Sequence, residues 1–324
     1  MLRLVVVVAE ATTIAITWPL WQVREAPSLL PLVGLPQVGF AWPLLACLAL
    51  ALRWPTFGAV LHAFVLALAM LADQTREQPQ MVSFGILLLA SSNHRGAVAL
   101  GTLHLCALWF WSGIGKLTSP HFLGAGGAWL LGAEEAGAAG TSLAVALGLT
   151  ELVLAVSCSI LRWRSRVAVV ASLLHANVLA FLVFARGANP AVWPWNAALA
   201  IAAPLLLRAA PARPWTAPGT FVPRLAALAF VVLPLGYHAG VVDAPFAMQV
   251  YTMNEPRAVR LHGDGRRESL LYLPELAVPL PPVPRIQRQW FQNEARAGER
   301  LALLERRPIA RWFGSRDELL TVAR

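Results

Sequence analysis

The sequence predicts an all-α polytopic membrane bundle of about eight or nine transmembrane helices, followed by a small α+β extramembrane tail. The chain has 324 residues, of which 57% are hydrophobic and 13% charged, and its mean hydropathy is +0.60. Soluble domains have about 45–50% apolar and about 25% charged residues. Charge is also uneven, because residues 1–240 carry 13 Lys/Arg and 7 Asp/Glu, whereas residues 241–324 carry 13 and 10. We therefore expect a transmembrane domain over 1–240 and an extramembrane tail over 241–324.

The transmembrane domain divides into apolar ranges that are read as spans. A helix needs about 20 apolar residues to cross the hydrocarbon layer. The expected spans are 2–21, 38–53, 55–72, 81–93, 96–117, 141–161, 166–186, 190–207 and 221–240. The first is expected to be a retained span rather than a signal peptide, because it contains Glu10 and no small-x-small site precedes Trp18. The Gly- and Ala-rich stretch 118–140 is expected to be re-entrant or to lie at the surface.

Basic residues in the short loops predict the orientation, because cytoplasmic loops carry more Lys and Arg. One set of alternating span ends has eight basic residues and the other has four. The larger set is Arg3, Arg53, Arg95, Arg162, Arg164, Arg166, Arg208 and Arg213, and the smaller is Arg24, Arg76, Lys116 and Arg186. This places the N-terminus in the cytoplasm and, with an odd number of spans, the tail outside. A bacterial inner membrane is the expected location.

The tail shows short elements that predict strands and one helix. Alternating residues predict short strands within 247–273, over 247–253, 257–263 and 268–274, separated by turns such as Gly263-Asp264-Gly265. The range 285–306 predicts an amphipathic helix with Trp290, Phe291, Leu301 and Leu304 on one face. So short a tail has little core of its own, so it is expected to pack on the span ends and is a possible docking site for a protein partner.

The net charge of +9 does not predict nucleic-acid binding, because the basic residues lie at loop ends and along the tail, as membrane orientation requires. Cys47, Cys106 and Cys158 all fall within apolar runs, and there is no CxxC pair. We therefore expect small buried side chains and no disulfide framework.

Lys116 is the most informative single residue, because the chain has 25 arginines and one lysine. It lies at the end of a span, in Trp109-Phe110-Trp111-Ser112-Gly113-Ile114-Gly115-Lys116-Leu117. Its ammonium either serves a function at the membrane boundary or anchors the helix end by snorkelling. Gly113 and Gly115 would allow a close helix approach beside it.

A second polar cluster, Asp73-Gln74-Thr75-Arg76-Glu77-Gln78-Pro79, lies between two apolar segments. Asp73 and Arg76 are three residues apart and can pair at a helix end, and Pro79 would open the next helix. The predicted orientation puts this cluster on the same side as Lys116. Asp73, Arg76 and Lys116 are therefore the candidate catalytic residues, although a solvated loop would explain the same composition.

Polar residues within spans form a third group, because ionisable side chains at membrane depth usually face the bundle interior and have a partner. The residues concerned are Glu10, His62, His104, Glu151, His175, Asn177 and Asn196. Glu151 with His175 could form a proton relay or half of a metal site, but no HxxxH or ExxH pair fixes a ligand geometry, so no metal site is predicted. Trp111, His104, Glu151 and His175 are the candidate ligand-binding residues. No nucleotide-binding, serine-hydrolase or zinc-protease motif is present.

Two of these clusters carry a resemblance to a known family. Leu71 to Pro79, followed by Phe110-Trp111-Ser112-Gly113-Ile114-Gly115-Lys116-Leu117 and Phe122, resembles bacterial multi-span proteins of the HTTM type, relatives of the membrane part of vitamin K-dependent gamma-glutamyl carboxylase. The aromatic-Ser-Gly-x-x-Lys-Leu element is also similar to the DoxX-like family. The resemblance covers residues 1–260, through Val250-Tyr251-Thr252-Met253-Asn254.

The resemblance implies an architecture and a site for a quinone-like or isoprenoid lipid molecule. In the carboxylases a lysine after the aspartate is the implicated base, and the matching residue here is Gln74, which cannot act as that base. It therefore does not imply glutamate carboxylation. Three hypotheses follow: a quinone- or lipid-linked membrane enzyme, a non-catalytic membrane protein that docks a partner through its tail, and a channel or carrier. Whether the protein is an enzyme stays open at this point.

Overall fold

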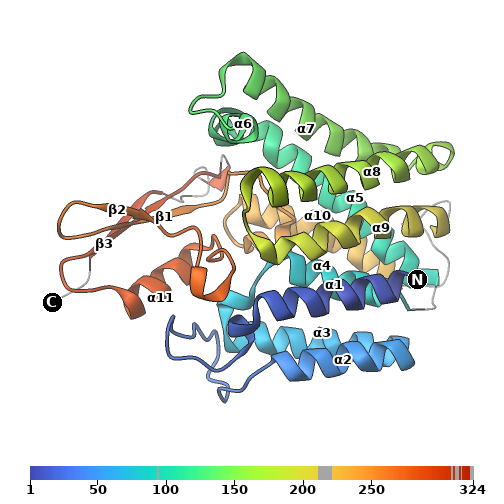
Figure 1. Ribbon diagram of the computed structural model, residues 1–324, viewed down its shortest axis with the longest axis horizontal. Helices are drawn as coiled ribbons and strands as arrows, with labels where there is room; N and C mark the ends of the chain where they lie inside the picture. Colours follow the sequence, from blue (N-terminus) through green and yellow to red (C-terminus); the bar gives the residue numbers. More distant parts are fainter. Residues whose placement is uncertain (93–94, 211–220, 308, 311–313, 315, 322–324) are drawn as a thin grey trace. The chain divides into compact units, whose positions relative to one another are not determined.

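The computed structural model is a largely helical protein with a small four-stranded sheet in its C-terminal part (Figure 1). It describes all residues except 93–94, 211–220, 308, 311–313, 315 and 322–324. The principal elements are α1 (Leu2–Ile16), α2 (Ala41–Arg53), α3 (Pro55–Ala72), α4 (Pro79–Ala90), α5 (Arg95–Thr118), α6 (Gly127–Leu131), α7 (Gly137–Ser157), α8 (Arg164–Ala180), α9 (Trp193–Ala209), α10 (Phe221–His238), β1 (Arg257–Leu261), β2 (Arg267–Ser269), α11 (Pro284–Glu294), β3 (Arg300–Leu304) and β4 (Glu318–Thr321). The helical bundle and the α+β tail are thus present.

Five helical segments in the described part are long and apolar enough to cross a membrane, which is the pattern of an integral membrane protein. They are Pro55–Ala72, Gly96–Thr118, Gly137–Ser157, Leu161–Arg186 and Pro190–Ala209. The expectation of eight or nine spans was therefore too high. Each expected range does contain a helix, but α1, α2 and α4 have only 15, 13 and 12 residues. At about 1.5 Å per residue such helices cover about 18–23 Å, less than the about 30 Å of the hydrocarbon core.

The residues form two compact units. Unit 1 comprises 1–104, 161–227 and 272–281, and unit 2 comprises 105–160, 228–271 and 282–324. Both units include residues from before and after position 240, and the division into domains at that position stays a prediction.

Unit 1 is a bundle in which α8 packs along α9, α2 along α3, and α1 against α9. Gly58 allows α2 and α3 to approach closely, because a Cβ at this position would overlap the backbone of Ala51 and lie 2.8 Å from the carbonyl carbon of Leu50. The tight turn at Trp54-Pro55 therefore brings the two helices into direct backbone contact.

In unit 2, the second half of α5 packs closely against α7. A Cβ on Gly113 would lie 2.8 Å from the carbonyl oxygen of Gly148, and one on Gly148 would lie 2.9 Å from the side chain of Leu117. The expectation that Gly113 permits close helix approach is confirmed. Between the two helices the chain forms a short π-helix (Phe122–Gly126) and the five-residue α6, which are too short to span a membrane.

This close approach explains a disulfide bond that was not expected. Cys106 on α5 and Cys158 after α7 are bonded, with their Cα atoms 6.7 Å apart. The expectation of three small buried thiols was wrong for this pair, because 52 residues separate the two cysteines and no motif links them. Cys47 is a free, buried cysteine, as expected.

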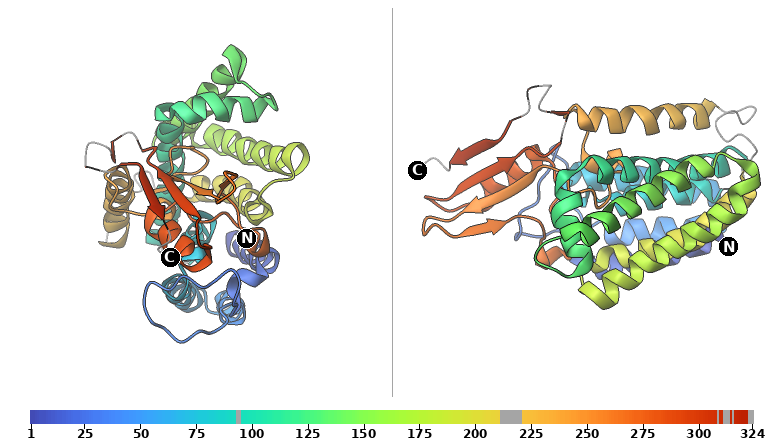
Figure 2. Two further views of the ribbon diagram at one scale, coloured as in Figure 1. Left: turned by 90° about the vertical axis from the view of Figure 1, so that its left-hand side faces the viewer. Right: turned by 90° about the horizontal axis from the view of Figure 1, so that it is seen from above.

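The sheet of unit 2 has the strand order β2-β1-β3-β4, and all neighbours are antiparallel (Figure 2). The helix expected over 285–306 ends at Glu294, and β3 follows. Leu301 and Leu303 are buried in alternation, which is a strand pattern, whereas the pair Leu301 and Leu304 had suggested a helix. The strand expected over 247–253 is absent, because Met248, Tyr251 and Met253 have positive φ angles.

A charged cluster joins β1 to the start of β3. The Glu299 carboxylate accepts hydrogen bonds from Arg260 at 2.9 and 2.5 Å and from the backbone N–H of Arg296 at 2.7 Å, and His262 Nδ1 lies 2.9 Å away. Burial raises the pKa of Glu299, but these bonds and the charge of Arg260 outweigh burial and lower the pKa from 4.5 to about 2. The carboxylate is therefore stabilised in its ionised form.

This cluster predicts an acid-sensitive tail. Because the pKa of Glu299 in the folded state lies below its ordinary value, its contribution to stability is complete above about pH 4.5 and is lost as the pH falls toward 2. We expect Glu299→Gln to lower the thermal unfolding temperature at pH 7 and to flatten its decrease between pH 4.5 and 3. Thermal unfolding in detergent measures both effects, with the exposed Glu275→Gln as control. Equal acid sensitivity of both variants would contradict this role.

Candidate functional site

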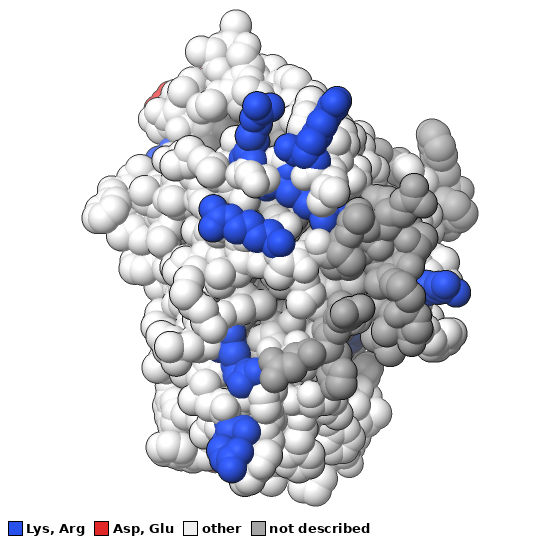
Figure 3. Space-filling view, turned by 90° about the vertical axis from the view of Figure 1, so that its right-hand side faces the viewer, with Lys and Arg blue, Asp and Glu red and all other residues white. Residues whose placement is uncertain are grey.

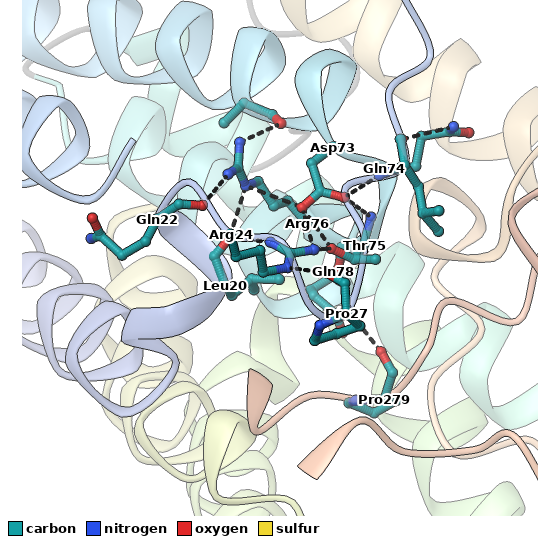
Figure 4. A network of polar contacts seen from close by, with 12 residues as sticks. Leu20, Gln22, Arg24, Pro27, Asp73, Gln74, Thr75, Arg76, Gln78 and Pro279 are labelled. Atoms are coloured by element: carbon teal, nitrogen blue, oxygen red, sulfur yellow. Dashed lines mark hydrogen bonds and ion pairs between the residues drawn. The ribbon is translucent and has the colours of Figure 1, made fainter. Parts of the chain in front are cut away.

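The polar cluster after α3 is a buried network in unit 1 centred on Asp73 (Figure 4). Asp73 is extended and precedes a single 3-10 turn, Gln74–Arg76. Its Oδ1 accepts from the backbone N–H of Leu30 and Thr75, both at 3.2 Å. Its Oδ2 accepts from the Thr75 hydroxyl at 2.9 Å and pairs with Arg24 at 2.6 Å. The carboxylate is completely buried and well supplied with donors.

Arg76 completes this Asp73 network, which we define as Arg24, Asp73, Thr75 and Arg76. The expected pairing of Asp73 with Arg76 is confirmed at 3.7 Å. The guanidinium donates to the carbonyl oxygens of Leu20, Ala69 and Gln22 at 2.9, 3.2 and 3.3 Å. Burial lowers the pKa of Arg76 to about 10, the Asp73 charge opposes this, and the Arg24 charge adds to it. Since its donors are directed at backbone carbonyls, Arg76 holds the loop after α1 against the end of α3.

Lys116 forms the second buried ion pair, in unit 2. Its ammonium donates to both oxygens of Glu151 at 2.9 and 2.8 Å, to the carbonyl oxygen of Val250 at 3.0 Å, and to the Ser112 hydroxyl. The side chains of Lys116 and Glu151 are 2% and 12% exposed. Lys116 is therefore not a snorkelling anchor, since its charge is turned inward to a carboxylate on α7.

The segment Met248–Glu255 packs beside this pair. A Cβ on Gly115 would lie 2.5 Å from Thr252 Cγ2 and would overlap Oε1 of Gln249, so this glycine admits the loop. The Thr252 hydroxyl lies 2.7 Å from Asn254 Oδ1 and 3.1 Å from Glu255 Oε1. Burial raises the pKa of Glu255, whereas its hydrogen bonds and the Lys116 charge lower it. The structure thus adds Glu255 to the surroundings of Lys116.

Gln249 is the most unusual member of this loop. Its side chain is 3% exposed, yet its Oε1 and Nε2 have no hydrogen-bond partner in the part of the chain that the structure describes. An unsatisfied buried amide costs about 1–3 kcal/mol. Strained backbone often occurs at functional sites, and Met248, Tyr251 and Met253 have left-handed φ angles of 54–55°. We call Ser112, Lys116, Glu151, Gln249 and Glu255 the Lys116 centre.

The other candidate ligand-binding residues have partners within the protein. Trp111 donates its indole N–H to the carbonyl oxygen of Phe230 at 2.7 Å. His104 lies 2.8 Å from the Ser83 hydroxyl. These side chains connect neighbouring helices.

The Glu151–His175 relay stays a prediction, because the two residues belong to different units. His175 Nδ1 lies 3.3 Å from Asn196 Oδ1 in unit 1, and Glu151 pairs with Lys116 in unit 2. Glu10 and His62, both fully buried, have their nearest oxygen and nitrogen 2.7 Å apart. Among the described residues, no group of three His, Cys, Asp or Glu side chains could hold a metal ion.

Lys116 and the Asp73–Arg76 pair belong to different units, and their expected position on the same side of the membrane stays a prediction. Comparisons of the chain with models of protein families, with curated proteins and with solved structures give no match. The candidate function therefore depends on the geometry of each site.

Proposed function

We propose that this chain is an integral membrane protein that binds a quinone-like or isoprenoid lipid molecule at the Lys116 centre. The observation that carries the proposal is the buried amide of Gln249, whose Nε2 and Oε1 have no hydrogen-bond partner among the described residues. Gln249 belongs to the same loop as Val250, whose carbonyl oxygen accepts from Lys116. A quinone oxygen can accept from the amide Nε2, and a hydroquinone hydroxyl can donate to Oε1. A quinone is an apolar ring that carries a few polar oxygens. It therefore suits a binding site that is mostly apolar and has a few convergent polar groups.

The residues of the centre have distinct roles in this proposal. Lys116 supplies a fixed positive charge toward which a ligand oxygen is attracted, and it can exchange one of its four acceptors for that oxygen. Glu255 is suited to hold or release a proton, because burial raises the pKa of its carboxyl. Glu151 orients the ammonium of Lys116. In this proposal the Asp73 network is structural, which revises the catalytic role expected for Asp73 and Arg76.

The family relation also belongs to the proposal. The HTTM-type resemblance is based on Leu71–Pro79 and on 110–117 with Phe122, and it extends through Val250–Asn254. The helix of Lys116 and the segment Val250–Asn254 lie together in unit 2. Support for the orientation comes from one face on which arginine side chains gather while Asp and Glu are nearly absent from view (Figure 3). Such a face is typical of the cytoplasmic side of a bacterial inner membrane protein.

The test is the retention of a quinone by the full-length protein. We expect gently solubilised protein to retain a ubiquinone-type or menaquinone-type molecule, identified by mass spectrometry, and Gln249→Leu to reduce its amount at least tenfold. Because the replaced amide has no hydrogen-bond partner in the described part of the chain, this variant should fold at least as stably as the parent. The exposed Gln292→Leu is the control. Unchanged retention in Gln249→Leu, or no retention by the parent protein, would refute the proposal.

The alternative function is the docking of a protein partner through the tail, and deletion of the tail would be a poor test of it. β3 lies inside the sheet between β1 and β4, so deleting residues 285–324 would remove an inner strand. A loss of function after that deletion would report unfolding of unit 2, and point changes on the exposed strand β2 would be the informative experiment.

A further inference from the structure

A cavity of about 300 Å³ lies in unit 2, where the chain leaves the C-terminal end of α10. Its walls come from Tyr237, the turn Gly240–Ala244, the start of α11 and the end of β3. We call it the α10 cavity. It is separate from the Lys116 centre, because none of the residues of that centre line it.

Arginines dominate the polar lining of this cavity. Arg285, Arg288, Arg307 and Arg316 line it, together with three acidic residues. The lining therefore has one more arginine than acidic residues, and one arginine has no acidic counterpart. That one is Arg316, which is exposed and has no ion pair or hydrogen bond to any residue within the described portion of the chain.

The other three arginines differ in how firmly they are held. Arg307 is buried and binds both oxygens of Glu305 at 2.9 and 2.6 Å, so it forms a fixed wall. Arg288 binds both oxygens of Glu318 at 2.9 and 2.7 Å, but these two side chains are 36% and 41% exposed. Arg285 pairs with Asp243 and is 37% exposed. Exposed ion pairs contribute little to stability, so an incoming anion can take over Arg285 and Arg288 at small cost.

Tyr237 adds a neutral donor to the cavity. Its side chain is 1% exposed and its hydroxyl has no hydrogen-bond partner among the residues that the structure describes. The backbone carbonyl of the same residue accepts from Arg307 at 3.2 Å, which occupies the negative end of α10. A ligand oxygen in the cavity would satisfy the hydroxyl.

The position of the cavity indicates the source of the anion. The last part of α10 exposes Leu228, Val231, Val232 and Leu235 by 51–59%, and Val241, which lines the cavity, is 79% exposed. An exposed apolar helix surface of this kind suits lipid chains, and the cavity follows directly where the helix ends. Arginine forks match phosphate oxygens in pairs.

We propose that the α10 cavity binds a phosphate ester anion, namely the head group of an anionic phospholipid whose chains lie along α10. Arg285, Arg288 and Arg316 bind the phosphate oxygens, Tyr237 donates a further hydrogen bond, and the valines of the turn after α10 contact the glycerol and upper acyl carbons. This site is independent of the function proposed for the Lys116 centre.

The experiment uses the full-length protein in mild detergent and measures retained lipid by native mass spectrometry. We expect phosphatidylglycerol to be retained at least tenfold more than phosphatidylcholine. Arg288→Gln/Arg316→Gln should reduce this retention about tenfold, and Tyr237→Phe, which keeps the ring, should reduce it several-fold. Arg266→Gln/Arg267→Gln removes two exposed charges elsewhere in unit 2 and is the matched control.

A competition with glycerol 3-phosphate distinguishes the two sources of the phosphate. Displacement of phosphatidylglycerol only at a large excess of glycerol 3-phosphate supports a lipid ligand. Glycerol 3-phosphate alone could instead protect the protein against thermal unfolding, with the protection lost in Arg288→Gln/Arg316→Gln. That result would support the phosphate site and would show that its ligand is a soluble phosphate ester rather than a lipid. Equal retention in the cavity variant and the control variant, with no response to either phosphate, would overturn the proposal.

Discussion

Lys116→Met is expected to lower the free energy of unfolding by about 3–5 kcal/mol, because it leaves the Glu151 carboxylate buried without its counter-ion. Glu151→Leu should cost a similar amount for the opposite reason. The two groups are 2.8 Å apart and only 2% and 12% exposed. Each single variant therefore retains a desolvated charge that the protein cannot compensate.

The double variant Lys116→Met/Glu151→Leu should lose less stability than either single variant. Replacing both partners of a buried ion pair by apolar side chains of similar size is often close to neutral. The coupling energy from this double-mutant cycle, measured by reversible unfolding in mixed micelles, should reach several kcal/mol. The exposed Arg166→Met is the control and should change stability by less than about 0.5 kcal/mol. If the two single losses simply add, the pair does not have the energetic role assigned to it.

This cycle also separates stability from ligand binding. The double variant keeps a packed interior but has neither the ammonium nor the carboxylate. Under the proposed function it should be folded and should no longer retain a quinone. A folded double variant with full retention would show that the Lys116–Glu151 pair only joins α5 to α7.

Local patterns in the sequence were the most reliable source of structural information. The pairing of Asp73 with Arg76 was predicted from their spacing of three residues, and the structure shows it at 3.7 Å, with Asp73 extended before a single 3-10 turn that ends at Arg76. The close approach at Gly113 was also predictable from a local pattern, since glycine has no side chain to keep a neighbouring helix away from the backbone. Each apolar range also became a helix, although length rather than composition decided which helices could span a membrane.

Partners distant in the sequence could not be predicted. Glu151 is 35 residues from Lys116, and the disulfide joins residues 52 apart. Both pairings depend on how α5 and α7 pack, which no single-helix pattern encodes. The loop 247–253 was expected to be a strand because its residues alternate, and only the left-handed backbone at Met248, Tyr251 and Met253 shows how Gln249 and Thr252 come to lie beside Gly115.

Asp73→Asn is the second change for which we expect a large effect, a loss of about 3–5 kcal/mol of unfolding free energy, because Arg24 and Arg76 would then lack their shared carboxylate. Removing one of the two uncompensated cations should restore part of the lost unfolding free energy. Asp73→Asn/Arg24→Gln should therefore be more stable than Asp73→Asn alone.

Thermal unfolding in detergent measures the relative stabilities of the single and double variants, with the exposed Asp264→Asn as control. The result also decides between two roles for the cluster. A structural role requires loss of stability with partial recovery in the double variant, because the donors of this network are directed at Asp73, at the Thr75 hydroxyl or at backbone carbonyls. A catalytic role, as the sequence alone had suggested, would instead leave Asp73→Asn stably folded and abolish ligand binding. Since the Asp73 carboxylate is fully buried and already accepts from Leu30, Thr75 and Arg24, the first outcome is the one that the geometry requires.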